Sequence, residues 1–273
     1  MSLLPAATVL VGCGKMGAAL LNGWLEQGVS PGSVRIVEPD PASAASAAGC
    51  GVSVVDDPRA LDSLPAPDVI VLAIKPQRID SLLSSYQRFV AGGSAVLSIA
   101  AGKTIGGLNH GLGGNAAVVR AMPNTPASIG RGITVACAND RVSPEQRALC
   151  DGLLACVGSV LWIDDEQLMD AVTAVSGSGP AYVFLLAECM ARAGEEMGLP
   201  AEVAARLARE TVAGAGAMLA RLPQSPDTLR ENVTSPGGTT AAALAELQAE
   251  DGLQPLLSRA IAAAAERAAE LAV

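Results

Sequence analysis

A short glycine-rich turn near the start of the chain has the residue types and the spacing needed to hold a pyrophosphate. It follows an apolar run and precedes a helix-like stretch, so it would join a strand to a helix. Its first glycine permits a tight turn, its second lets the backbone approach the phosphates, and its third lets the helix pack on the strand. The helix N-terminus adds N–H donors and a positive dipole. A glycine-rich corner without a ligand is the alternative. We predict that a dinucleotide is bound by Gly12, Cys13, Gly14, Lys15, Met16 and Gly17.

An acidic residue, Glu38, stands at the end of the next strand-like run, at the place where dinucleotide-binding folds hold the ribose. Its carboxylate can accept both ribose hydroxyls of NAD and would repel the 2′-phosphate of NADP. The nearest arginine, Arg35, is expected inside the strand. Electrostatics therefore favours NADH, while NADPH stays open. A solvated loop acid is the alternative interpretation of Glu38.

Three further segments combine glycine or proline with polar side chains. We expect Ser176–Tyr182 and Thr234–Thr240 each to interrupt helical sequence and to create a new helix N-terminus that can hold a carboxylate. Arg120–Pro126 ends a strand and is expected at the carboxyl edge of the sheet, where ligands of α/β proteins bind. Each segment alone also fits an ordinary cap or turn. The three together, beside a dinucleotide fold, favour a substrate site.

The sequence lacks the usual catalytic side chains of ketone reduction. Its single histidine, His110, is expected in a glycine-rich surface loop, and no Ser-Tyr-Lys constellation is evident. Reduction of a ketone needs a strong proton donor, whereas an imine nitrogen can be protonated near neutral pH before the hydride arrives. Hydroxyls and backbone N–H groups therefore suit an imine. The six cysteines form no C-x-x-C pair, so we expect reduced thiols and no metal site.

Strand-like and helix-like runs alternate through the first part of the chain. The helix-length segments between the strands indicate βαβ units and a parallel sheet. The predicted fold class is α/β, with an N-terminal Rossmann-type domain. Strands are predicted at residues 8–11, 34–37, 52–55, 69–74, 95–99, 117–121, 133–138 and 157–163, and helices at 16–26, 42–48 and 79–89.

After about Asp164 the pattern changes to alanine-rich helices without a strand-like run. We expect a dinucleotide-binding Rossmann domain over residues 1–164 and an all-α substrate and dimerisation domain over residues 165–273. Alanine-rich helices have few bulky side chains for a core of their own, which predicts pairing with a second chain. Helices are predicted at residues 168–175, 181–197, 201–221, 239–249 and 256–271, with the alanine-rich tail helical to Val273.

Composition limits the class of partner. The 273 residues carry a formal net charge of −9, which argues against a nucleic-acid or membrane-surface partner because phosphate would be repelled. Aromatic residues make up 2%, so the core must be built from Ala, Val, Leu and Ile. Met1–Pro5 contains neither a basic region nor a long apolar stretch. We therefore expect no signal peptide or transmembrane segment, and a cytoplasmic location.

Taken together, these segments resemble the pyrroline-5-carboxylate reductase family over nearly the whole chain. The segments Ser176–Tyr182 and Asn232–Thr240 are highly specific to that family, whereas the glycine-rich turn is not. The other matching segments are Ala73–Gln77, Ser98–Gly102 and Arg120–Pro126. The resemblance implies hydride transfer from C4 of the reduced nicotinamide to the C=N carbon of 1-pyrroline-5-carboxylate, giving proline in the last step of its biosynthesis. It also implies a homodimer through the helical domain, and larger rings of dimers occur in the family.

The resemblance also implies site residues. Thr240 would hydrogen-bond the pyrroline nitrogen and complete the site of the partner chain. A threonine is a poor acid, so we assign it positioning rather than full proton delivery. Substrate would be held by Ser235, Gly238, Thr239 and Thr240, and the cofactor would also contact Ala73, Ile74, Lys75, Pro76, Ile99, Ala100, Ala101 and Asn232.

The sequence departs from the family pattern at two places. Members that favour NADPH often have Ser or Asn where this chain has Glu38. Some relatives carry a substrate-contacting Glu before the Asn232 segment, but the stretch here is Leu222–Ser225, and no residue is carried over.

Two other functions remain alternatives. A β-hydroxyacid dehydrogenase or a related imine reductase would share the architecture. The hydroxyacid enzyme would need a catalytic lysine on a helix early in the second domain, and residues 181–197 contain no lysine. A non-catalytic dinucleotide sensor would not need the anion site of Ser235–Thr240. The sequence leaves open NADH against NADPH, the number of dimers, feedback by proline and activity on other cyclic imines.

Overall fold

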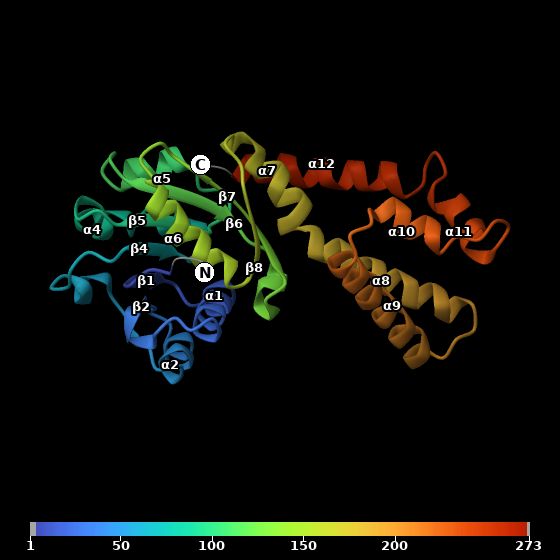
Figure 1. Cartoon of the computed structure of the whole chain (residues 1–273), viewed down its shortest axis with the longest axis horizontal. Coiled ribbons are helices and arrows are strands. Elements are labelled where there is room, and N and C mark those ends of the chain that lie inside the picture. The colour runs from blue at the N-terminus through green and yellow to red at the C-terminus, as the bar shows by residue number, and fades with distance from the viewer. Residues whose placement is uncertain (1–3, 272–273) are drawn as a thin grey trace. The chain divides into compact units, whose positions relative to one another are not determined.

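The computed structural model describes residues 4–271. The chain forms two compact units: residues up to Gly177 together with those from Ala264 onward, and Ser178–Ala263 between them. Part of the N-terminal segment behind the expectation of no signal peptide, and the last two residues of the predicted helical tail, lie outside the described residues. The labelled elements of both units can be followed in Figure 1.

The first unit is built on one eight-stranded sheet in the order β3-β2-β1-β4-β5-β6-β7-β8. Strands β1 to β6 pair in parallel, and β1 lies between β2 and β4. All eight predicted strands are present, with ends shifted by a few residues. They are β1 (Thr8–Val11), β2 (Val34–Val37), β3 (Ser53–Val55), β4 (Val69–Leu72), β5 (Ala95–Ser98), β6 (Ala117–Met122), β7 (Gly132–Ala138) and β8 (Gly158–Trp162).

One pair of strands departs from the predicted parallel sheet. Strand β7 runs antiparallel to β6, with Arg120 opposite Cys137. The connection between them holds only the short 3-10 turn Thr125–Ile129. A parallel crossover needs a dozen or more residues, so this connection can only return the chain antiparallel. The α/β class with a Rossmann-type first part is confirmed.

Helices cover both faces of this sheet. They are α1 (Lys15–Glu26), α2 (Pro41–Gly49), α3 (Pro76–Ile79), α4 (Gln87–Ala91), α5 (Ile105–Gly111), α6 (Pro144–Ala155) and α7 (Met169–Val172). The single helix predicted at residues 79–89 is wrong: the segment breaks into α3, a 3-10 turn and α4. The Ser81 hydroxyl donates to the carbonyl oxygen of Arg78 at 2.9 Å, a local bond that competes with regular helix. Helices α5 and α6 were not predicted, although the Ser143–Gln146 capping box of α6 is a readable signal.

Two hydrophobic clusters, one on each face, hold the sheet to its helices. One cluster contains Leu10 with α1 and α6, where the Trp24 Nε1 group donates to the carbonyl oxygen of Leu153 at 2.9 Å. The other contains Val9 and Phe89. Because alternate residues of β1 belong to different clusters, the strand is buried on both faces, as a central parallel strand must be.

The second unit consists of helices alone. They are α8 (Gly179–Glu196), α9 (Ala201–Arg221), α10 (Pro226–Asn232), α11 (Thr239–Leu247) and the first part of α12 (Leu253–Leu271). No residue of α8 is buried, and α9 buries only Ala204 and Ala208. The predicted shortage of core is therefore present. Large apolar side chains that stay exposed include Val183, Phe184, Leu185, Leu186, Met190, Leu207, Met218 and Leu219.

The segment Ser176–Tyr182 does not create the new helix N-terminus that was predicted. Ser178 has a right-handed helical conformation, with φ −83° and ψ −24°, and caps nothing with its side chain. The wide π-turn Thr173–Gly177 precedes it, so the glycines and Pro180 are accommodated within helical backbone.

By length and composition the helical run Glu166–Glu196 is long and apolar enough to cross a membrane.

The position of residues 165–177 differs from the expected domain division after residue 164. These residues belong to the first compact unit. Met169 is buried there beside Val135 and Cys137 of β7, and Asn124 donates from its side-chain amide to the carbonyl oxygen of Ser176 at 3.1 Å. Packing on the sheet therefore assigns this segment, whereas its helical sequence had suggested the second domain.

Candidate functional site

The glycine-rich turn joins β1 to α1 and leaves the start of α1 open. Gly12 has a left-handed φ of 91°, and its N–H donates to the carbonyl oxygen of Val37 at 2.9 Å. A Cβ on Gly17 would collide with the carbonyl oxygen of Gly12, so only glycine lets α1 lie this close to the turn. Gly14 is the N-cap of α1, no side chain caps the helix, and a Cβ on Gly14 would meet nothing within 4 Å. The N-terminus of α1 thus borders open space.

Glu38 is bound to this turn rather than solvated. It is buried, with 8% of its surface exposed. Its Oε2 accepts from the Cys13 N–H at 2.7 Å, and its Oε1 accepts from the Asp40 N–H at 2.9 Å. Its own N–H donates to the carbonyl oxygen of Val55. The carboxylate is therefore fixed in direction by backbone donors on two sides.

A cavity of about 620 Å³ lies at this edge of the sheet. Six predicted cofactor residues line it: Gly12, Gly14, Glu38, Ala73, Ile74 and Lys75. Cys13, Lys15, Met16 and Gly17 belong to the same turn and the start of α1, and Pro76 begins α3. The structure thus brings the glycine-rich turn, Glu38 and the segment after β4 around one space.

The cavity around Glu38 is more acidic than this residue alone would make it. Asp40, Asp56 and Asp57 also line the cavity, together with the cations Lys75 and Arg78. Hydrogen bonds from Arg59 lower the pKa of Asp57 to about 2, so this carboxylate is ionised at neutral pH. Asp56, Asp57 and Arg78 were missed from the sequence. Two acids directly after the third strand, at the carboxyl edge, were the available signal.

Cys13 contributes no charge to the glycine-rich turn. Burial, then the neighbouring Glu38 carboxylate, then Cys50, raise the pKa of its thiol to about 11. The thiol is therefore neutral at physiological pH. A thiolate at this position would repel a pyrophosphate, whereas the neutral thiol does not.

The loop after β5 carries the next predicted cofactor residues, Ile99, Ala100 and Ala101. They lie outside the described lining of the 620 Å³ cavity. The Ala100 N–H donates to the Ser98 hydroxyl oxygen at 3.3 Å, and the Lys103 ammonium pairs with Asp80 at 2.7 Å. Lys103 is buried and Asp80 is exposed, and this ion pair joins the loop to the residue that follows α3.

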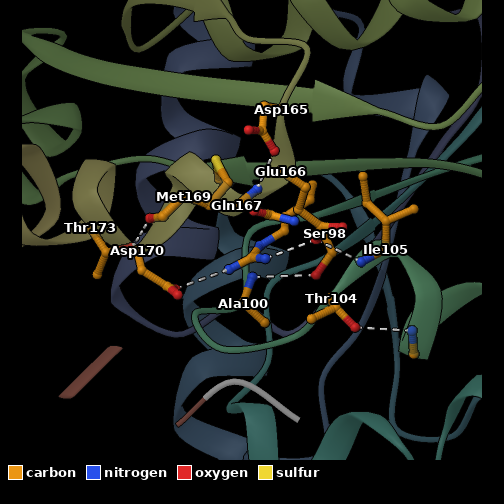
Figure 2. Close-up of polar contacts among 12 residues, drawn as sticks. Ser98, Ala100, Thr104, Ile105, Asp165, Glu166, Gln167, Met169, Asp170 and Thr173 are labelled. Atoms are coloured by element: carbon orange, nitrogen blue, oxygen red, sulfur yellow. Dashed lines mark hydrogen bonds and ion pairs between the residues drawn. The ribbon is translucent and has the colours of Figure 1, made fainter. Parts of the chain in front are cut away.

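Arg120, at the start of the third polar segment, lies on β6, the strand next to the one that leads into this loop. It is in register with Ser98 on the neighbouring strand, and its guanidinium is buried. Its Nη1 donates to Glu166 Oε1 at 2.8 Å, and its Nη2 lies 4.0 Å from Asp170 Oδ1. Figure 2 shows the surrounding polar contacts. Farther along, Asn124 accepts from the Ile133 N–H at 3.0 Å. The segment thus joins β6 to β7 and to the residues before α8.

His110 lies within α5 rather than in the glycine-rich loop that was predicted. Its position on the surface is as expected, since its side chain is exposed.

The predicted substrate turn lies in the helical unit, between α10 and α11. Gly237 has a left-handed φ of 69°, and Gly238 is the N-cap of α11 without a side-chain cap. The Gly238 N–H donates to the carbonyl oxygen of Ser235 at 3.0 Å, and a Cβ on Gly238 would collide with the Ser235 hydroxyl. Thr239 and Thr240 then begin α11. Asn232, the last predicted cofactor residue, ends α10 in this same unit.

The turn Ser235–Thr240 can hold an anion for the same physical reason as the start of α1. An uncapped helix N-terminus presents N–H donors and the positive end of the helix dipole. The neighbouring hydroxyls of Thr239 and Thr240 can accept or donate further hydrogen bonds. Within the helical unit the structure therefore brings the four predicted substrate residues into one turn.

Known families match both parts of the chain. A family described as pyrroline-5-carboxylate reductase dimerisation matches residues 166–271, and one described as NADP oxidoreductase, coenzyme F420-dependent, matches residues 8–102. A pyrroline-5-carboxylate reductase of Pseudomonas aeruginosa is 41% identical over 96% of this chain and 95% of its own length.

Two solved structures are similar over the full chain. A pyrroline-5-carboxylate reductase from Coxiella burnetii superimposes with a TM-score of 0.92 at 34% identity, covering 98% of this chain and 99% of its own. The enzyme of Plasmodium falciparum, solved with NADP bound, gives 0.82 at 28% identity and covers both chains fully, 100% of each.

Proposed function

The chain belongs to the pyrroline-5-carboxylate reductase family, and from this premise we propose how its residues reduce 1-pyrroline-5-carboxylate to L-proline with NAD(P)H, the last step of proline biosynthesis. Reduced nicotinamide supplies a hydride to the C=N carbon. The protein's part is to hold the two reactants in contact and to exclude water. One observation carries this proposal. The chain has two helices whose N-cap is a glycine and whose N-terminus has no side-chain cap, at Gly14 and at Gly238.

The site around Gly14 fits a dinucleotide. The space next to Gly14, the uncapped N-terminus of α1 and the 620 Å³ cavity provide room and N–H donors for a pyrophosphate. Ala73, Ile74, Lys75 and Pro76 follow β4, and Ile99, Ala100 and Ala101 lie in the loop that follows β5, the next strand of the sheet. We assign the pyrophosphate to the turn and the nicotinamide to the loop after β5. By the family resemblance, Asn232 at the end of α10 is also assigned to the cofactor.

NADH is the preferred donor in this proposal. Glu38 cannot swing away from a 2′-phosphate without losing both backbone hydrogen bonds that hold its carboxylate. Asp40, Asp56 and Asp57 line the same cavity and add repulsion. The free lone pairs of the Glu38 oxygens can still accept ribose hydroxyls. The Plasmodium relative binds NADP, so the preference of this chain rests on its own acids.

Replacing Glu38 by serine is expected to move cofactor preference toward NADPH. The ratio of kcat/KM for NADPH to that for NADH should rise about tenfold to a hundredfold, equivalent to roughly 1.4–2.8 kcal/mol, because the ribose acid is lost while three other carboxylates remain. Steady-state kinetics with both cofactors measures the ratio. Asp62→Ser is the matched control, since Asp62 is an exposed carboxylate paired with Arg88. A wild-type enzyme that already strongly prefers NADPH would contradict the role of Glu38.

The substrate is held by the turn of the helical unit. The Gly238 and Thr239 backbone would bind the carboxylate, Ser235 would support the turn, and the Thr240 hydroxyl would hydrogen-bond the pyrroline nitrogen. A protonated imine needs no strong acid from the protein. This is consistent with a site that offers hydroxyls and N–H groups.

The helical unit is also the site of oligomerisation, and we propose that a second copy covers its exposed apolar helices in a homodimer. Four consecutive residues of α8, from Val183 to Leu186, are exposed. A lipid-facing helix is unfavourable to charge, yet the exposed Arg192 and Glu188 form an ion pair at 2.7 Å on α8. A protein partner therefore fits this helix better than a membrane. All six cysteines are free, which supports a reducing, cytoplasmic location.

The experiment that tests the reaction is the loss of reduced-nicotinamide absorbance with 1-pyrroline-5-carboxylate as substrate. A 2-oxoacid is the control, because it tests the hydroxyacid dehydrogenase alternative. Oxidation of NADH or NADPH with the pyrroline, and none with the 2-oxoacid, is the expected result. Turnover of the 2-oxoacid alone, or of neither compound, would overturn the proposal.

A further inference from the structure

Glu166 lies outside the residues assigned above, yet it connects three segments of the first unit. One oxygen, Oε1, accepts both the Arg120 Nη1 donor and the backbone N–H of Ile105, each at 2.8 Å. Arg120 comes from β6 and Ile105 is the first residue of α5. Figure 2 shows Glu166 beside Ile105, joined by a dashed line for this hydrogen bond. A single carboxylate oxygen thus joins the sheet, the start of α5 and the segment that precedes α7.

The bond to Ile105 fixes the far end of the loop that follows β5. The near end is held by Ser98, which is fully buried and accepts from the Ala100 N–H. The middle is held by Lys103 on Asp80. Without Glu166, the Ile105 N–H would belong to the unpaired first turn of a helix, and the far end of the loop would lose this anchor.

The charges around Glu166 keep it in place. The Arg120 guanidinium, 6% exposed, faces Glu166 and Asp170, each with 30% of the side chain exposed. A buried cation that loses its carboxylate is strongly unfavourable, so Arg120 draws Glu166 toward the sheet. Cys137 lies opposite Arg120 on β7, and burial raises the pKa of its thiol to about 11, so it adds no competing charge.

We propose that Glu166 is a positioning residue for hydride transfer: held by Arg120, it fixes the loop Ile99–Thr104 against the reduced nicotinamide. This inference rests on the proposed function, which assigns that loop to the nicotinamide. Hydride transfer depends steeply on the distance and angle between donor and acceptor. A loop that moves would lower the rate of that step while leaving the pyrophosphate and ribose contacts at the other end of the cofactor intact.

The test compares Glu166→Ala with wild type by two independent measurements. In the protein without cofactor, amide hydrogen exchange over residues 100–105 should become at least about tenfold faster, because the Ile105 N–H loses its acceptor. In the assay, kcat should fall about tenfold to a hundredfold, with the Kd for NADH changed less than about threefold. With NADH deuterated at the transferred position, the primary isotope effect on kcat should rise.

Asp151→Ala is the matched control. Asp151 Oδ1 accepts from Trp162 Nε1 at 2.8 Å and so joins α6 to β8, away from the loop. Its loss should lower the Tm without changing loop exchange, kcat or the isotope effect. Glu166→Gln keeps an oxygen acceptor for Ile105 but loses the charge that holds Arg120, so both of its readouts should fall between wild type and Glu166→Ala.

Faster exchange in the loop without a lower kcat overturns the proposal, and so does a lower kcat without faster exchange. If Glu166→Ala does not fold, the Gln variant decides in the same way. A wild-type protein that does not reduce the pyrroline refutes the proposed function itself, whereas an active wild type with unaffected Glu166 variants refutes only the positioning role.

Discussion

Gly14→Ala is expected to leave the protein folded and to weaken NADH binding by about a hundredfold. A methyl group at this position meets no protein atom within 4 Å, and the backbone there, with φ −67° and ψ −165°, suits alanine. The methyl would instead occupy the space through which the backbone approaches the pyrophosphate. Losing hydrogen bonds to a charged group costs about 1.5–3 kcal/mol each, which gives the expected factor. Fluorescence titration with NADH measures it.

Thermal unfolding separates this effect from misfolding. Alanine is a poorer N-cap than glycine, by at most about 1 kcal/mol, so the Tm should fall by no more than about 4 °C. Gly17→Ala, in contrast, should unfold the domain, because the added Cβ would collide with the carbonyl oxygen of Gly12. Gly49→Ala, also with open space around it but outside the cavity, is the control that should change neither property. Unaltered NADH affinity in Gly14→Ala would place the pyrophosphate elsewhere.

Thr240→Ala is expected to lower kcat/KM for the pyrroline by roughly tenfold to a few hundredfold, about 1.4–3.5 kcal/mol. Thr240 is the second residue of α11, directly after the uncapped start of the helix. The variant removes the hydroxyl that would orient the ring nitrogen, while the N–H groups assigned to the carboxylate remain. Steady-state kinetics at saturating cofactor measures the loss.

Two neighbouring substitutions make this result specific to the hydroxyl. Thr240→Ser retains the hydroxyl and should recover most of the activity. Thr228→Ala removes another threonine hydroxyl of the helical unit, one that shares a 3.0 Å hydrogen bond with Ser225, and should leave kcat/KM unchanged. Equal kinetics for wild type and Thr240→Ala would remove Thr240 from the site.

The strands could be predicted from the sequence because local information decides them. Apolar, β-branched runs such as Val69–Leu72 are buried on both faces of the sheet and stand out from their surroundings. The glycine-rich turn could be predicted too, since each glycine has its own steric reason. The direction of β7 depends on the connection after β6, which is too short for a parallel crossover, and not on the residue pattern of the strand itself.

Residues that act through long-range contacts could not be predicted in the same way. Glu166 resembles any solvated helix acid in sequence, and only folding brings it to Arg120, 46 positions earlier. Likewise, the glycines and the proline of Ser176–Tyr182 suggested a helix start, but a π-turn accommodates them within helical backbone. The substrate residues of the helical unit were named by resemblance, and their roles stay predictions.

The hydrogen bond between Glu38 and the Cys13 N–H makes the choice of cofactor inseparable from the rigidity of the free protein. The carboxylate that would bind the ribose also accepts a hydrogen bond from the turn that would bind the phosphates. A substitution that relaxes discrimination therefore also loosens the turn, and ordering it again on binding has an entropic cost. Redesign toward NADPH would accordingly need a second, compensating change that stiffens the turn by other means. A lineage that changed cofactor would have met the same constraint, and in this fold the two traits are expected to evolve as a pair.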